Sequence, residues 1–157
     1  MPKMDRKEKR FWELFHGFKN EKAIPEVTDR LFYKEMELYD EHLEYISRRV
    51  KKVDRLEMNE TYVTDTGLEA LTKMERIKEL QLKSLEGVTD AAIPVLSQIN
   101  GLEFLHLGGT SVTVNGANGL SAAANLNRLI LSRGNATDAE IEVLKAALPN
   151  CDVAVNP

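Results

Sequence analysis

The stretch YVTDTGLEAL (62–71) is followed 25 residues later by GVTDAAIPVL (87–96). Both stretches place a valine before a Thr-Asp pair and continue with apolar residues three positions apart. Two amphipathic helices can share such a phrase by chance, whereas a chain built from stacked copies of one unit repeats it at a fixed period. The surrounding apolar positions distinguish the two explanations.

Those apolar positions do recur at one period. An L-x-L pattern, with methionine once in its second place, appears four times, and its first members are 24, 25 and 24 residues apart. The four pairs are Leu56/Met58, Leu80/Leu82, Leu105/Leu107 and Leu129/Leu131. Further apolar positions precede and follow each pair at the same spacing. Several columns that hold their register through four copies indicate a repeat.

Each unit has the pattern expected of a short strand followed by a helix. The alternating L-x-L predicts a half-buried strand. Thr64-Asp65, Thr89-Asp90 and Thr137-Asp138 supply side-chain oxygens where a helix begins and its first N–H groups need acceptors. Apolar residues three apart then form the inward stripe of the helix. Because one unit cannot bury its own apolar side, several stacked units would share one continuous core.

The pattern L-x-x-L-x-L followed by V-T-D-x-x-L-x-x-L resembles the leucine-rich repeat family, in particular its cysteine-containing type with units of about 25 residues. The resemblance covers about residues 50–157. It implies an α/β solenoid with short parallel strands on a concave face and helices on the convex face. Val153 and Val155 follow Leu129 and Leu131 by 24 residues, which predicts a strand that closes the stack.

The residues before the first repeat admit two interpretations. Residues 30–46 align with the first repeat at an offset of 25, so that Leu31 and Tyr33 match Leu56 and Met58. The same residues also suit a continuous capping helix by intrinsic propensity. The sequence leaves a degenerate repeat and a capping helix as alternatives.

Upstream, apolar side chains recur at helical spacing within residues 5–18. They are Phe11, Leu14, Phe15 and Phe18. This stripe predicts a helical cap over the first repeat; the alternative is an amphipathic helix for a membrane or a partner. Pro25 marks a joint after it. We therefore expect a helical cap at residues 1–27 and repeats at residues 28–157.

Composition and motifs restrict the function. The net charge of −4 argues against nucleic acid and anionic membranes and weakly favours a basic protein partner. No apolar run of roughly 20 residues is present to span a membrane. The lone Cys151 cannot form an internal disulfide, which favours the cytoplasm.

His16, His42 and His106 lack the spacing of metal ligands, and no catalytic motif stands out. We expect no enzymatic activity, no cofactor and no metal.

A binding surface remains. In a strand, the residues between buried leucines point to the opposite face, so stacked strands present rows of side chains on the concave side. The predicted partner-binding residues are Arg55, Glu57, Glu79, Gln81, Phe104, His106, Arg128 and Ile130. Aromatic and aliphatic residues ringed by charge have the composition of a binding hot spot. The alternative is that these apolar residues are merely scattered over the surface.

We therefore expect a monomeric cytoplasmic protein that binds another protein through its concave strand face. Proteins with this resemblance act as adaptors or as inhibitors, and a bacterial immunity protein that neutralises a toxin is one such role. The alternative is a scaffold or assembly subunit of a permanent complex. It would bury the uncharged side of the third repeat, because residues 104–127 contain no charged residue before Arg128.

Overall fold

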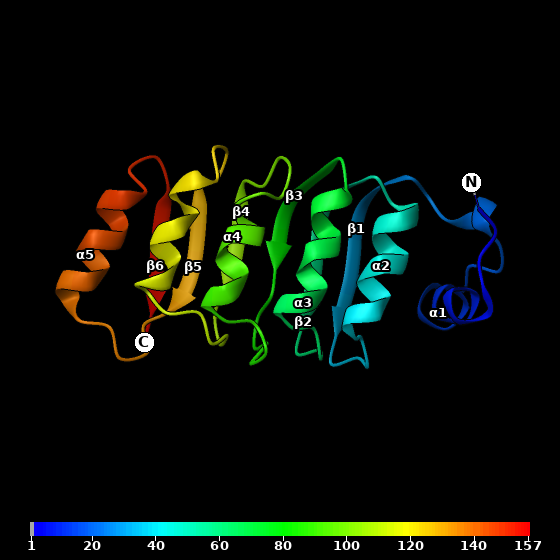
Figure 1. The fold of residues 1–157 in the computed structure, drawn as a ribbon, viewed down its shortest axis with the longest axis horizontal. Helices are drawn as coiled ribbons and strands as arrows, with labels where there is room; N and C mark the ends of the chain where they lie inside the picture. The colour runs from blue at the N-terminus through cyan, green and yellow to red at the C-terminus, as the bar shows by residue number, and fades with distance from the viewer. Residues whose placement is uncertain (1) are drawn as a thin grey trace.

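Six strands form one parallel sheet in the computed structural model, which describes residues 2–157. The strands are β1 (Val27–Lys34), β2 (Lys52–Asn59), β3 (Arg76–Gln81), β4 (Phe104–Leu107), β5 (Arg128–Ser132) and β6 (Asp152–Asn156). They follow one another in chain order, and each pairs with the next in parallel. Helical segments connect them and lie side by side on one face of the open sheet (Figure 1). The protein is therefore of the α/β class.

The helical segments differ in length along the chain. They are α1 (Arg6–His16), η1 (Glu21–Ala23), α2 (Asp40–Arg49), α3 (Asp65–Leu68), η2 (Glu69–Lys73), η3 (Asp90–Ala92), α4 (Ile93–Leu96), η4 (Gly116–Ala122) and α5 (Asp138–Ala147). The segments in the middle of the sheet are short α-helical or 3₁₀ turns. Pro94 stands in the first turn of α4, and two glycines weaken helix formation in η4.

The leucines of the repeated pattern lie next to one another in the sheet. Leu80 pairs with Leu56 on one side and with Leu105 on the other, and Leu105 pairs with Leu129. All four are fully buried beneath the helices. Val153 pairs with Leu129, so the predicted closing strand is confirmed as β6. This register follows from the constant period, because equivalent residues of successive units reach the same position along the strand direction.

Residues 30–46 do not form a continuous helix. Their first part belongs to β1, where Leu31 pairs with Leu56 and Tyr33 with Met58, which is the register of the repeat alignment. A turn and α2 follow. The capping-helix interpretation is wrong because aromatic and aliphatic side chains in β1 gain more from pairing and burial than a local helix offers.

Helix α1 covers the N-terminal end of the core, beyond β1 and α2 (Figure 1). It begins after Asp5, whose side chain accepts the N–H of Glu8, and it ends at His16, with Gly17 as its C-cap. Phe11 and Trp12 are buried, but Leu14, which the sequence placed on the inward stripe, is 68% exposed. The large Trp12 ring takes the inward position beside Phe11, which rotates Leu14 towards solvent.

Candidate functional site on the open face of the sheet

The strand residues between the buried leucines form the face of the sheet that points away from the helices. We call it the open sheet face. Its first row is Arg30, Arg55, Glu79, Phe104, Arg128 and Asp152, and its second row is Phe32, Glu57, Gln81, His106, Ile130 and Ala154. These rows follow from parallel pairing, since each residue has its equivalent on the next strand as neighbour. All eight residues predicted from the sequence lie here.

The apolar residues of the predicted cluster are brought together on β4 and β5. The Phe104 and His106 rings lie 6.4 Å apart between centroids, and His106 pairs in register with Ile130. All three side chains are half-buried. The guanidinium of Arg128 lies over the Phe104 ring, 5.3 Å from its centroid. An aromatic ring that is partly desolvated and covered by arginine offers both apolar contact and cationic hydrogen-bond donors.

Glu57 was predicted to contact a partner, but its side chain is buried on this face. Its side chain accepts a hydrogen bond from Arg30 Nη2 at 2.7 Å, and Arg55 Nη1 lies 3.7 Å from its other oxygen. The two arginines cover the carboxylate, so that the residue is only 4% exposed. A buried carboxylate needs such partners because its desolvation is costly. Glu57 therefore positions two arginines of the face and is itself shielded from a partner.

Two further residues of this face were missed from the sequence. Phe32 is 42% exposed, and the Arg30 guanidinium lies 4.4 Å from its ring centroid. They form a second arginine–aromatic pair, on β1. The alignment of residues 30–46 with the first repeat contained the signal, because it places Arg30 and Phe32 at the positions of Arg55 and Glu57.

His106 is a neutral hydrogen-bond donor at neutral pH. Its Nδ1 accepts the backbone N–H of Gly108 at 3.0 Å, so that Nε2 carries the proton of the neutral ring. Burial lowers the pKa of His106, and the nearby charges of Lys83 and Arg128 lower that pKa further. Both changes keep the imidazole uncharged at pH 7.

The charges of the open sheet face are paired on one side and unpaired on the other. Arg55 donates to Glu79 at 2.8 Å, and Arg30 donates to Glu57. Arg128 on this face and the exposed Lys83, in the turn two residues after the end of β3, by contrast, have no carboxylate within 4.0 Å among residues 2–157. Positive charge is thus available around His106.

Other exposed surfaces lie outside this face. A groove of about 570 Å³ runs between α1 on one side and, on the other, the segment before α2 and the first turn of α2. Its lining residues are Arg10, Leu14, Phe15, Met36, Glu37, Tyr39, Glu41 and His42. The uncharged residues 104–127 are divided between β4, on the open sheet face, and the short η4, on the helical side, where Ser121 and Ala122 are exposed.

Neither a metal centre nor a membrane span is formed by the part of the chain that the structure describes. Across residues 2–157, no three His, Cys, Asp or Glu side chains converge as metal ligands would. No helix in the same range is both long and apolar enough to cross a membrane. A scan against protein-family models and a search of the curated proteins found no match. Function is therefore inferred from the geometry of the chain.

Proposed function

We propose that the protein is a non-enzymatic, leucine-rich-repeat-like solenoid that binds another protein through the open sheet face. One observation carries the proposal: Phe104 is half-buried beneath Arg128 and stands beside His106 and Ile130. Interfaces concentrate their binding energy in aromatic and arginine anchors of this kind, surrounded by polar residues.

The repeat class is supported by the register of the sheet. Leucines 24 or 25 residues apart pair directly, and every connection between strands places its helical segment on the same side of the sheet (Figure 1). In solenoids the strand side is wider than a single loop and presents side chains from several units at once. Such a surface suits a folded protein as partner.

We infer a cytoplasmic, monomeric protein that acts as an adaptor or as an inhibitor of the immunity type. The lone Cys151 supports a reducing compartment. The inhibitor role draws on analogy with other small repeat proteins that cover a partner's active site.

A second candidate is a scaffold subunit that buries the helical side of the third repeat. It is favoured by the exposed small residues of η4, which allow close approach of another chain because nothing long or charged projects from them. Substitution of Ala122 by glutamate would disrupt that surface and leave the open sheet face intact.

The test compares capture of a partner from the native host by matched variants. Phe104→Ala with Arg128→Glu should lower the affinity for the captured protein by about two orders of magnitude. Val143→Ala with Lys145→Glu likewise truncates an exposed apolar side chain and reverses one positive charge, but on α5, and should leave capture unchanged. Unchanged capture by the first variant excludes the open sheet face, and loss only in Ala122→Glu favours the scaffold function.

A further inference from the structure

The open sheet face has two electrically different halves. On β1 and β2, Arg30 and Arg55 are neutralised by carboxylates within the face. On the other half, Lys83, just after β3, and Arg128, on β5, have no such partner within residues 2–157, although Asp152 pairs with Arg128 in register. A charge without a partner on a binding surface favours contact with the opposite charge.

The register places these two cations on either side of His106. Its strand neighbours are Gln81 on β3 and Ile130 on β5. Lys83 follows Gln81 by two residues, and Arg128 precedes Ile130 by two. Both cations act on the His106 ring, as the direction of its pKa shift also indicates. Three groups that can donate hydrogen bonds to an anion therefore share one half of the face.

We propose that this half of the open sheet face recognises an acidic segment of the partner protein. A partner carboxylate binds between Lys83, Arg128 and the Nε2–H of His106, and an adjoining apolar side chain packs on Phe104 and Ile130. The negative charge of the whole chain favours a basic partner, but the charges at the contact decide which sequence binds there. This inference rests on the proposed function and names the chemistry of its partner.

The first experiment uses two defined peptides and an isotope-labelled protein. Acetyl-Leu-Glu-Leu-Glu-amide and acetyl-Leu-Lys-Leu-Lys-amide are titrated to about 10 mM, which detects binding in the millimolar range. The acidic peptide should shift the resonances of His106 and Phe104 and raise the pKa of His106, because a nearby carboxylate favours imidazolium. The basic peptide should not.

Charge reversal supplies the control. Lys83→Glu with Arg128→Glu should abolish the shifts, while Arg6→Glu with Lys9→Glu, the same charge change on α1, should preserve them. Equal shifts with the basic peptide, no shifts with the acidic one, or shifts that survive in the Lys83/Arg128 variant would overturn the proposal.

The captured natural partner separates this inference from the proposed function. If Phe104→Ala weakens capture and Lys83→Glu with Arg128→Glu weakens it by about tenfold or more, both stand. If Phe104→Ala weakens capture but the charge reversal strengthens it, the face binds a basic partner and only the inference fails. If neither change affects capture, the proposed function fails.

Discussion

At the scale of single residues, aspartates join each repeat to the next. Asp40 accepts hydrogen bonds from both the backbone N–H and the hydroxyl of Thr64, at 2.7 and 2.5 Å. The same pair of bonds runs from Thr89 to Asp65, and again from Thr113 to Asp90. Each carboxylate therefore satisfies a threonine one unit further along the chain.

Each of these Asp–Thr hydrogen-bond pairs, which we call a bridge, restricts which residues can stand next to it. A Cβ on Gly67 would clash with the Asp40 carboxylate and lie 2.9 Å from the Asp40 Cα, so glycine is needed for this close approach. In the third repeat Val114 stands where the others have aspartate, and within residues 2–157 no aspartate of a preceding unit accepts from Thr137. Thr137 instead forms a capping box with Glu140 inside its own helix.

Asp65→Ala should lower the free energy of unfolding by about 2 kcal/mol, because two hydrogen bonds to a charged acceptor are lost and the Thr89 N–H is left without its partner. Urea denaturation at pH 7 measures the change. Glu86→Ala, at an exposed glutamate whose side chain makes no hydrogen bond within residues 2–157, is the control and should be nearly neutral. Equal effects of the two substitutions would show that the bridge contributes nothing.

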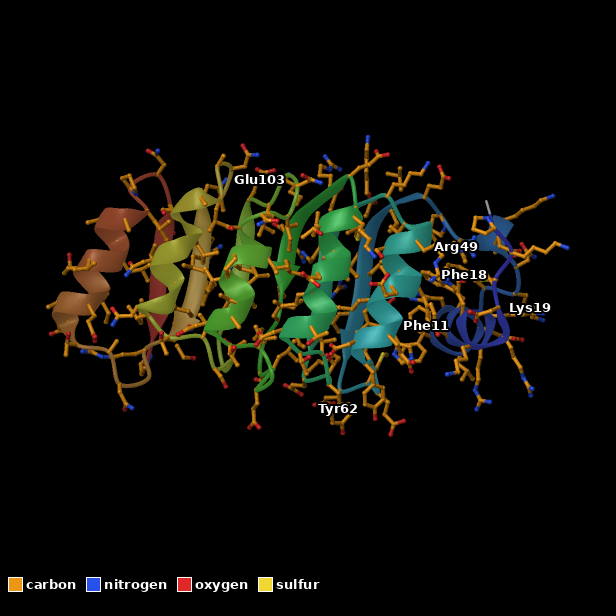
Figure 2. The ribbon with its side chains drawn as sticks, in the orientation of Figure 1. Phe11, Phe18, Lys19, Arg49, Tyr62 and Glu103 are labelled. Atoms are coloured by element: carbon orange, nitrogen blue, oxygen red, sulfur yellow. The ribbon has the colours of Figure 1, made fainter. Side chains whose placement is uncertain are left out.

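At the scale of elements, a buried ion pair ties α1 to α2. Glu8 on α1 accepts from Arg49 Nε at 2.6 Å and from Arg49 Nη2 at 3.1 Å, and both side chains are almost fully buried. Arg48 donates to the same carboxylate at 2.9 Å. Phe11 and Phe18 lie at the same junction as Arg49 (Figure 2). The pair fixes how α1 covers the end of the sheet.

Glu8→Ala should destabilise the protein by about 3–5 kcal/mol, because it leaves the Arg49 guanidinium buried without its carboxylate. Replacing both residues, as Glu8→Leu with Arg49→Met, should recover much of this loss, since apolar side chains of similar size avoid the desolvation cost. Chemical denaturation of the single and double variants gives the comparison. A double variant no more stable than Glu8→Ala would contradict this account.

The period of the sequence explains which elements could be predicted. Leu80, Leu105 and Leu129 recur at constant spacing, so their stacking and the rows of the open sheet face follow directly. Glu8 and Arg49 belong to no repeated pattern, and nothing in the sequence indicates that they meet. The burial of Glu57 was missed for a similar reason, because it depends on Arg30 in a strand whose assignment was open.

At the scale of the whole molecule, the N-terminal end of the core contains two histidines among aromatic rings. His16 Nε2 lies 2.6 Å from the Tyr33 hydroxyl, and His42 stacks on Phe11 with ring centroids 5.0 Å apart. Burial raises the pKa of Tyr33, so its hydroxyl keeps its proton and can donate a hydrogen bond to His16 Nε2. Burial also lowers the pKa of both His16 and His42. The environment at this end of the core therefore favours the neutral form of both imidazoles.

Acidification should consequently destabilise the fold. In the unfolded chain histidine titrates near pH 6.5, whereas in the folded protein the pKa values of His16 and His42 are lower than that. Between the two pKa values the unfolded state binds more protons, so the free energy of unfolding decreases as the pH falls through 6.5, by at most about 1.4 kcal/mol per pH unit for each histidine. His16→Gln with His42→Asn keeps a hydrogen-bond acceptor at both positions and removes the titration. Urea denaturation at pH 7.0 and 5.5, a range above most carboxylate titration, should show a smaller pH dependence in this variant, with that of His106 remaining. An identical pH dependence in the variant and the unmodified protein would show that these two histidines do not couple protonation to folding.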